Sequence, residues 1–549
     1  MRELFAAQPV IVVDGVRFDD ELDGYVEQVV VDEHVELPQM FAVTLHDPQR
    51  DVIDRSGMRI GAEVEIAVAG QGADEAEVAL VKGDLVAVEC DYDELGARVV
   101  ARGYATSHRL HRGRRTRTFI NVTDGDIVER VAREAGVEVG AVQSPETVYE
   151  HVTQPNVSDW QFLAARARAI GYELAVVDGR LEFGRPSRSE EAPTPLEAEV
   201  DTARDPRQLT FGENLLSFHG RISAAEQVKK VEARGWSVER KEAFVATAPA
   251  GTVAAQLELA DPETLAGFFG DPEFVSADRP LDENEAEAVA RALAERIGSG
   301  FAEADGVAVG HASLRAGTPV AVTEVGEDFS GKYVLTHTRH VFDRDGYRTH
   351  FTISGRHDRS LLGLVSAAPG HANGSNGSGV AQIDGLVRGI VDENFDPLEL
   401  GRVRIRLPWL NDDFTSAWAP VMQLGAGPRS GTFFLPAVGD EVLVGFEHAD
   451  IDRPIVVGGL FNGRDEPPVH SQLLDNGRVT GRGVFSRKGH RILLHDANDI
   501  SGITLSTVDG DVSIGINAIE QKLVLHSQGS IEISALGDVV IQGAKIKLN

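Results

Sequence analysis

The sequence predicts a mainly β fold with α+β insertions, and three observations support this prediction. Glycine is abundant, with 57 residues in a chain of 549, and many short valine-rich runs alternate apolar and polar positions. The C-terminal tail repeats pairs of aliphatic residues with glycine in or beside the gaps. Such patterns are typical of many short strands joined by turns. At roughly 150 residues per domain, the length predicts three or four domains, which is more than one hydrophobic core supports.

The composition is that of a folded, acidic protein. Hydrophobic residues make up 42% and charged residues 25% of the chain, which is too apolar for broad disorder. The 86 acidic residues against 53 basic ones give a formal net charge of −33. Because this charge repels phosphate backbones and anionic lipids, we expect no nucleic-acid partner and no stable membrane insertion.

Cysteine usage and apolar segments predict the compartment of synthesis. Cys90 is the single cysteine, which excludes an intrachain disulfide and a cysteine-based zinc finger and is typical of a reducing compartment. The segment 1–7 lacks the apolar core of a signal peptide, and no stretch approaches the roughly 18 apolar residues of a membrane helix. We therefore expect cytoplasmic synthesis without a signal peptide.

The first elements of the chain are strands. Period-2 runs separated by Asp-Gly and Asp-Pro turns predict antiparallel strands over 9–107, and strand patterns return over 211–247 and 304–356. Residues 186–205 are rich in proline, serine and acidic residues, which predicts a linker or an exposed loop.

Three helices interrupt the strand patterns. A short amphipathic helix is predicted after the capping residue Thr123. Ser158 and Gln161 form a capping-box pattern ahead of an apolar face that ends before Gly171. A third helix, rich in alanine, is predicted over 283–297.

The sharpest change in composition lies at 368–379, a run of glycine, serine and asparagine in which no residue can anchor a core. This run predicts a domain boundary. The next 85 or so residues carry five or six strand patterns, as expected for a small Greek-key barrel of the OB type.

The tail from 489 to 549 predicts a repeat of two-to-three-residue strands and turns, as in a β-helix or an intertwined β-prism. Strands this short cannot bury an apolar face within one chain, so we expect three copies to wrap around one axis as a homotrimer. The residues predicted to form the core of this trimeric needle are Ile503, Leu505, Val512, Ile514, Leu523, Leu525, Ile531, Ile533, Val539, Ile541, Ile546 and Leu548.

Ordered motifs in the chain carry a family resemblance. The segments 389–392, 396–405, 408–410, 416–419, 433–436, 438–446 and 454–458 resemble the OB domain of VgrG spike proteins and phage baseplate assembly proteins. The segments 156–172, 214–218, 231–236 and 329–334 resemble the phage late-control hub protein. The stretches 12–15 and 37–41 look most like the branch of extracellular contractile injection particles.

The resemblance implies a fused tail hub and cell-puncturing spike at the tip of a contractile, phage-tail-like injection system. The implied divisions are a hub region of two β-barrels with helical insertions at 1–365, a linker at 366–380, an OB-fold domain at 381–465, a connector at 466–488 and a needle at 489–549. The implied partners are an inner tube protein, baseplate proteins, a PAAR-type tip protein and an effector cargo. Assembly would place the chain in a particle that is released or retained by the producing cell.

Within the OB motifs, Trp409, Trp418, Phe433, Phe434 and Pro436 are predicted to pack in the barrel, and for the two tryptophans packing at an interface is the alternative. No residue is predicted to be catalytic, to bind a cofactor or to ligate a metal, because the common enzyme fingerprints are missing from the sequence. Two other functions stay open: a spike with a hydrolase within 186–300, and a carbohydrate-binding tail protein.

Two clusters remain ambiguous in the sequence. The basic run 108–117 is either a contact to an acidic partner or another subunit, or a solvated hairpin. His311, His337, His340 and His350 could suggest a metal, but histidines scattered over strands are more typical of surface or core positions.

Overall fold

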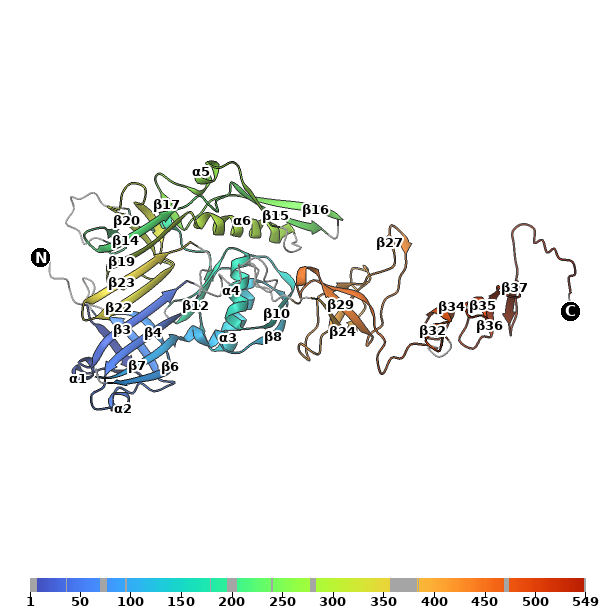
Figure 1. The fold of residues 1–549 in the computed structure, drawn as a ribbon, viewed down its shortest axis with the longest axis horizontal. Coiled ribbons are helices and arrows are strands. Elements are labelled where there is room, and N and C mark those ends of the chain that lie inside the picture. Colours follow the sequence, from blue (N-terminus) through green and yellow to red (C-terminus); the bar gives the residue numbers. More distant parts are fainter. Residues whose placement is uncertain are drawn as a thin grey trace. The chain divides into compact units, whose positions relative to one another are not determined.

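The computed structural model is rich in strands and divides into two compact units, Met1–Gly459 and Leu460–Asn549 (Figure 1). The residues that the structure describes are 7–35, 37–69, 77–93, 96–177, 179–194, 205–237, 240–276, 283–355, 383, 385–468 and 473–547. The predicted linker at 366–380 and residues 195–204 of the loop at 186–205 lie outside them.

An eleven-stranded sheet forms the frame of the hub region. Its strands, in pairing order, are β14 (Leu215–Ile222), β19 (Ala302–Val309), β23 (Gly346–Ile353), β22 (His337–Asp343), β3 (Val26–His34), β4 (Leu37–His46), β7 (Gly96–Ala105), β6 (Val78–Asp93), β5 (Glu63–Val68), β1 (Pro9–Val13) and β2 (Val16–Arg17). The antiparallel pair β22–β3 joins the early and late parts of the chain. One core around Phe41 and Ile66 and a second around Leu314 and Tyr333 therefore share one continuous sheet.

A small α+β insertion follows the first part of this sheet. Strand β8 (Arg115–Val122) pairs with β10 (Tyr149–Val157), and β11 (Glu173–Val177), β12 (Arg180–Gly184) and β9 (Glu138–Val142) form a second sheet. Helix α3 (Asp124–Ala135) begins with a capping box at Thr123, and α4 (Asp159–Ala169) begins with the predicted capping box of Ser158 and Gln161. Both predicted helices are confirmed.

The second half of the hub adds two sheets and the third predicted helix. One sheet contains β13 (Gln208–Thr210), β20 (Pro319–Thr323), β21 (Gly331–Val334) and β17 (Ala255–Leu257), and the other contains β16 (Glu242–Pro249), β15 (Lys230–Ser237) and β18 (Glu273–Ser276). Helix α6 (Glu283–Ser299) packs its alanines, such as Ala290, on Val231 and Ala233 of β15. The short elements of the hub are α1 (Asp20–Asp23), α2 (Val52–Ser56), α5 (Pro262–Gly267), η1 (Thr106–His111) and η2 (Ser189–Glu191).

The OB domain is a five-stranded sheet with a small aliphatic core. Its strands, in pairing order, are β26 (Ala419–Pro420), β25 (Arg402–Arg406), β24 (Leu386–Glu393), β29 (Glu441–Phe446) and β30 (Pro454–Gly459), and the hairpin β27 (Ala426–Gly427) with β28 (Ser430–Gly431) and the turn η3 (Glu447–Ala449) complete it. Val391, Val403, Ile405, Val442 and Val444 are fully buried inside.

In the single chain, three of the aromatic side chains predicted to pack in this barrel lie outside its interior, and packing at an interface, the alternative for the tryptophans, stays a prediction. Trp409, Phe433 and Phe434 are exposed, Phe433 to 75%. Branched aliphatic side chains already fill the narrow interior, so these large rings lie outside the core. Trp418 is half-buried under the guanidinium groups of Arg402 and Arg404, and Pro436 is half-buried as well.

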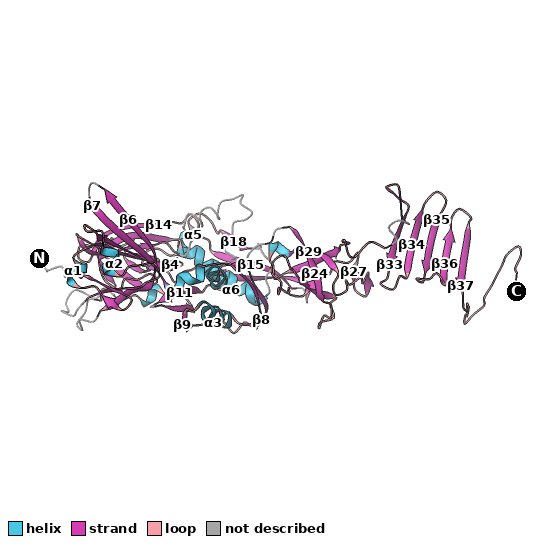
Figure 2. Cartoon of the chain, turned by 90° about the horizontal axis from the view of Figure 1, so that it is seen from below, coloured by secondary structure: helices cyan, strands magenta, loops and turns pink. Residues whose placement is uncertain are grey.

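The second unit carries a five-stranded antiparallel meander (Figure 2). After the hairpin β31 (Leu474–Asp475) and β32 (Arg478–Val479), the sheet contains β33 (Gly481–Phe485), β34 (Arg491–Asp496), β35 (Ser501–Ser506), β36 (Val512–Asn517) and β37 (Lys522–Ser527). The predicted strand length of two to three residues is wrong, because serines, threonines and glycines between the aliphatic pairs belong to the opposite face of the same strands. The sheet also begins at Gly481, ahead of the predicted limit at 489.

Candidate functional site

The sheet of the second unit, called here the needle sheet, presents an apolar face made by residues of all five of its strands. Strand register places the aliphatic residues opposite one another: Ile514 lies between Leu505 and Leu525, and Ile516 lies between Ile503 and Leu523. The needle face consists of Val484, Ile492, Leu494, Ile503, Leu505, Ile514, Ile516, Leu523 and Leu525. In strand β36 the same alternation puts Val512 on this face.

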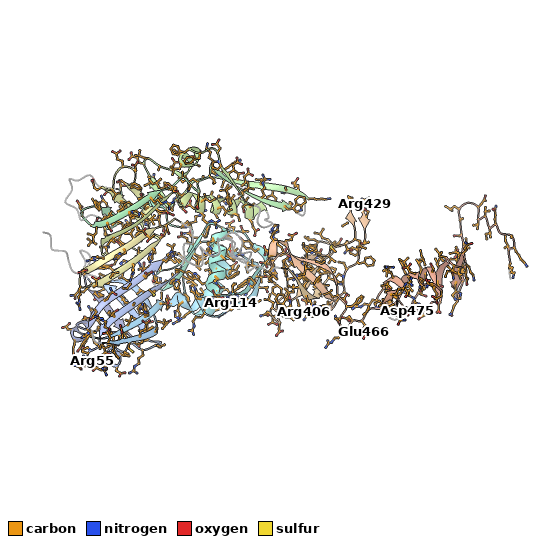
Figure 3. The ribbon with its side chains drawn as sticks, viewed as in Figure 1. Arg55, Arg114, Arg406, Arg429, Glu466 and Asp475 are labelled. Carbon is orange, nitrogen blue, oxygen red and sulfur yellow. The ribbon has the colours of Figure 1, made fainter. Side chains whose placement is uncertain are left out.

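The needle face is open to solvent in the single chain. Leu523 is 64% exposed and Leu525 is 51% exposed, and Figure 3 draws the side chains of this unit as sticks. The opposite face carries mostly small and polar residues such as Thr504, Gly515 and His526, and it also carries Phe485, Leu493 and Val524. A contiguous exposed apolar face bordered by polar residues marks an interaction surface, since a lone sheet of this kind is only marginally stable in water.

The predicted needle core falls into three groups. Ile503, Leu505, Val512, Ile514, Leu523 and Leu525 lie on the needle face. Ile531, Ile533, Val539, Ile541 and Ile546 are more than half exposed and follow the last strand, in a stretch where the structure has no strand up to residue 547. Leu548 lies outside the described residues. The predicted core did not include Val484, Ile492, Leu494 and Ile516. In β34 the apolar Leu493 between Ile492 and Leu494 hides the alternation, whereas Ile516 alternates with Ile514 across Gly515 and could have been found.

A second exposed apolar surface, the barrel patch, lies on two loops of the OB domain. It consists of Phe395, Leu398, Leu400, Phe433, Phe434 and Val438, all more than half exposed. A buried carboxylate shapes the first loop: Asp396 accepts hydrogen bonds from the backbone N–H groups of Leu398 and Leu400, at 3.1 and 2.9 Å. The Arg402 side chain, at 2.7 Å, and these N–H groups hold the pKa of Asp396 well below its usual range.

The basic run 108–117 is largely paired within the chain. Arg109 donates two hydrogen bonds of 3.1 Å to Asp84, and Arg117 pairs with Asp159 at 2.6 Å and with Glu134. His111 stacks on Trp160 with ring centroids 4.9 Å apart, and burial lowers the pKa of His111 to about 4. Arg112 and Arg114 are exposed. This run is therefore partly a structural ion-pair cluster, and its exposed arginines are the part left for a partner.

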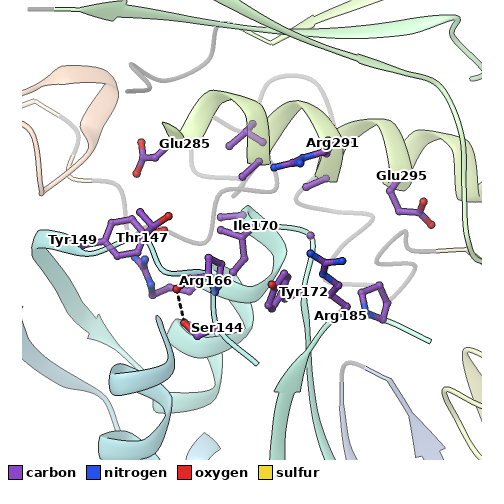
Figure 4. A pocket seen from close by; sticks show the side chains of 18 of the residues that line it. Ser144, Thr147, Tyr149, Arg166, Ile170, Tyr172, Arg185, Glu285, Arg291 and Glu295 are labelled. Atoms are coloured by element: carbon purple, nitrogen blue, oxygen red, sulfur yellow. Dashed lines mark hydrogen bonds between the residues drawn. The ribbon is translucent and has the colours of Figure 1, made fainter. Parts of the chain in front are cut away.

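A cavity of about 650 Å³ lies in the hub between α4, β10 and α6 (Figure 4). Arg166 pairs with Asp124 and lies 4.3 Å from the ring centre of Tyr149, and burial raises the pKa of Tyr149. On the α6 side, Glu295 accepts a hydrogen bond of 3.0 Å from the Val253 backbone N–H. Arg166 and Glu295 thus have partners in the walls of the cavity, and of these residues only Val253 and Glu295 belong to the segment 186–300.

The four histidines that could suggest a metal lie in other settings. His340 is buried with its Nδ1 2.8 Å from the hydroxyl of Tyr347, and His337 lies 2.9 Å from Asp32. Within the described ranges, no three His, Cys, Asp or Glu side chains are grouped closely enough to hold a metal ion. No helix in those ranges is long and apolar enough to cross a membrane.

Two family models match the chain. The Alg8 N-terminal domain matches residues 10–343, and the type VI secretion system/phage-baseplate injector OB domain matches residues 387–461. The chain is also similar to two spike proteins of the type VI secretion system of Pseudomonas aeruginosa. It is 36% identical to VgrG2a over 74 residues, which is 13% of this chain and 9% of that protein. It is 37% identical to VgrG5 over 87 residues, which is 15% of this chain and 11% of that protein. The matches thus span about a tenth of these curated relatives.

Solved structures are similar in fold. A chain of the lidded Francisella PdpA-VgrG complex aligns over 96% of this chain and 81% of its own length, with a TM-score of 0.54 and 8% identity. A chain of the lidless complex aligns over 95% of this chain and 99% of its own length, with a TM-score of 0.52 and 8% identity. This likeness extends over the hub, the OB domain and the needle.

Proposed function

This chain belongs to the Alg8 N-terminal domain family and is a VgrG-like spike protein, and we propose that it forms the structural hub and puncturing spike of a contractile injection system. The hub would join the sixfold inner tube to a threefold spike. The observation that carries the proposal is the needle face, an ordered apolar surface that one chain leaves exposed directly after a hub and an OB domain.

Three copies of the needle would cover this face. If three sheets turn their needle faces toward one axis, Ile503, Ile514 and their neighbours leave water, and the polar faces remain outside. Side chains such as Ile514 would then interlock, and many backbone hydrogen bonds would bear axial load in parallel. The barrel patch would be covered in the same assembly.

The remaining partners follow from the same role. The hub would bind the inner tube protein and the baseplate proteins, and the end of the needle would carry a PAAR-type tip protein or an effector cargo. The particle would be of the extracellular injection type. Neighbouring genes that encode tube, sheath and AAA ATPase would separate this type from a type VI secretion system or a phage tail.

The oligomeric state is the direct test. Light scattering of the purified full chain should give about three times the monomer mass of 59.1 kDa. A clean monomer at micromolar concentration would contradict the proposal. Negative-stain images should show a spike with threefold symmetry.

We propose that the spike acts mechanically and catalyses no reaction. Arg166 pairs with Asp124 and Glu295 accepts a backbone hydrogen bond from Val253, so both side chains have structural partners, which supports this view. Purified trimer incubated with peptidoglycan should release no soluble fragments. Robust turnover that disappears on substitution within 186–300 would instead favour the enzyme-bearing alternative.

A further inference from the structure

The hub and the OB domain meet at a small polar contact, called here the joint. Strand β10 of the hub insertion contributes His151 and Thr153, and the OB domain contributes the turn 447–453 and the loop 411–416. His151 lies at the centre of the joint, with its side chain only 8% exposed.

The ring of His151 bridges two turns of the OB domain. Its Nδ1 lies 3.1 Å from Oδ1 of Asp452, and its Nε2 lies 2.9 Å from the backbone carbonyl oxygen of Thr415. A carboxylate and a carbonyl oxygen are both acceptors only. Both ring nitrogens must therefore carry hydrogen for both bonds to exist, and this requires the imidazolium form.

We propose that the joint is a proton-dependent latch in which protonated His151 ties the hub to two turns of the OB domain at once. Neutral imidazole carries hydrogen on one nitrogen, so it can hold only one of the two turns. The ring lone pair then faces the oxygen of the other turn, which repels it. The second turn is released when the proton is lost.

The turn 447–453 and strand β10 together fix the position of the Asp452 carboxylate. His448 and Ala449, just before it, have φ angles of 49° and 63°, in the left-handed region that costs a non-glycine residue free energy. Asp452 also accepts the Oγ1–H of Thr153 at 2.6 Å and the backbone N–H of Thr153 at 3.2 Å. Because these bonds need no proton from the ring, Asp452 stays anchored to β10 when His151 is neutral.

We therefore expect the loop 411–416, which contains Thr415, to be released when His151 is neutral. A second hydrogen bond from this loop to the insertion comes from the amide of Asn411, which donates to the Thr116 carbonyl oxygen at 3.3 Å, longer than a typical N–H···O bond. The OB domain would then keep its attachment through the turn 447–453 and lose the one through 411–416. One attachment leaves more freedom of rotation than two.

Charged groups reach the joint from several elements. On the turn 447–453, Asp450 accepts the N–H of Asp452 at 3.0 Å, and Arg453 pairs with Glu285 of α6 at 3.4 Å. Strand β8 presents Thr118, Ile120 and Val122 to the face that carries His151, and none of these is charged. Beside Thr415, the carboxylate of Asp392 pairs with Arg406. Glu150 precedes His151 in the sequence. Tyr149 and the pair of Arg166 with Asp124 lie at the hub cavity, which Asp452 also lines.

The direction of the pH effect follows from this arrangement. Histidine is the side chain that ordinarily changes charge between pH 5 and 8. The bond that needs the imidazolium is present at low pH and is lost as the pH rises.

Hydrogen exchange of the full-length protein tests the latch. Amide exchange of peptides covering 411–416 and 149–153 would be measured at pH 6 and pH 8.5 and corrected for the intrinsic pH dependence of exchange. We expect the protection factor of 411–416 to fall at least about tenfold at the higher pH, because this is the change in the opening equilibrium that loss of one hydrogen bond to a charged group produces. The 149–153 peptide, which contains the Thr153 amide held by Asp452, should change less.

Two variants separate His151 from the other histidines. In His151→Gln, protection of 411–416 should be the same at both pH values. In His337→Gln, which removes a second histidine–aspartate pair of 2.9 Å in the hub sheet, the wild-type pH dependence should persist. The inference is overturned if the wild type shows equal protection at both pH values, or if His151→Gln keeps the difference. The wild-type series decides on its own should the glutamine variant fail to fold.

Discussion

The hub and the needle are both rich in aliphatic side chains, but the hub buries them within one chain and the needle leaves them exposed. In the hub, residues such as Val43, Leu45 and Ile66 are fully buried within one chain. In the needle, Ile514 and Leu523 remain open although they are equally apolar. The difference lies in the number of layers: helices and a second set of strands cover the hub sheet, whereas the needle sheet is a single layer. The hub therefore buries its aliphatic side chains within one chain, whereas the needle face would be buried only under the further copies that we propose.

The two units also differ in net charge. The segment 460–549 carries nine basic and ten acidic residues, so nearly all of the formal charge of −33 belongs to the first unit. A strongly acidic needle would repel its own copies at short range. The almost neutral charge of the segment 460–549 is therefore compatible with the proposed assembly of three needles.

The largest expected effect comes from a charge on the needle face. Ile514→Asp would place three carboxylates at the proposed axis, and burial of an unpaired charge costs several kcal/mol per chain. We expect the trimer to dissociate, with the mass in light scattering falling to that of the monomer. Ser513→Asp, on the opposite face of the same strand, is the matched control and should leave the trimer intact. Equal behaviour of the two variants would argue against the inward-facing arrangement.

The next effect concerns the hub and should leave the oligomer unchanged. Glu33, whose side chain is 2% exposed, forms a bidentate ion pair with Arg315 at 2.7 and 3.0 Å and so links the two halves of the hub. Glu33→Gln removes the negative charge beside the largely buried guanidinium of Arg315, which keeps its hydrogen bonds to the backbone carbonyl oxygens of Ala79 and Leu80. Loss of the charge from this pair should cost up to about 3–5 kcal/mol. Denaturant unfolding of the hub transition should measure this loss. Glu89→Gln, which breaks the exposed pair with Arg102, should cost less than about 1 kcal/mol.

A smaller effect is expected in the OB domain and depends on pH. Asp396→Asn should destabilise this domain by about 2 kcal/mol at neutral pH, since it removes charged hydrogen bonds from Arg402 and from backbone N–H groups. Because the folded-state pKa of Asp396 is depressed, its stabilisation is present above the usual carboxyl pKa and is lost as the pH falls through the folded value. Thermal melts between pH 7 and 2 should converge for the wild type and the variant. Curves that stay parallel would show that Asp396 is not the group responsible.

The smallest effect is expected in the basic run. Arg109→Gln removes a partly exposed pair with Asp84 and should lower stability by less than about 1 kcal/mol. Arg114→Gln should not change the melting temperature measurably, because its side chain is exposed. If Arg114→Gln nevertheless weakens binding of the hub to tube or baseplate proteins in a pull-down assay, the exposed arginines of this run form part of that interface.

Local chemistry made the secondary structure predictable. The capping box of Ser158 and Gln161 and the alanine-rich pattern of 283–297 specify helices through neighbouring residues alone. The aliphatic pairs of the needle predicted an apolar face, but they gave strands that are too short. The polar residues beside these pairs also form backbone hydrogen bonds in the sheet and so lengthen each strand. Aromatic residues of the OB motifs such as Phe433 could not be placed from the sequence, because the space available inside the barrel is known only once the fold is complete.

By itself, the sequence determined the order of the parts, the acidic hub, the near-neutral tail and the alternation that makes the needle sheet amphipathic. Each of these depends on residues close together in the chain. Only the tertiary structure decided which distant segments meet: β22 with β3, Arg315 with Glu33, and His151 with Asp452. These contacts arise from the closure of sheets and the docking of domains, and such long-range pairing leaves no periodic signal in the segments that it joins.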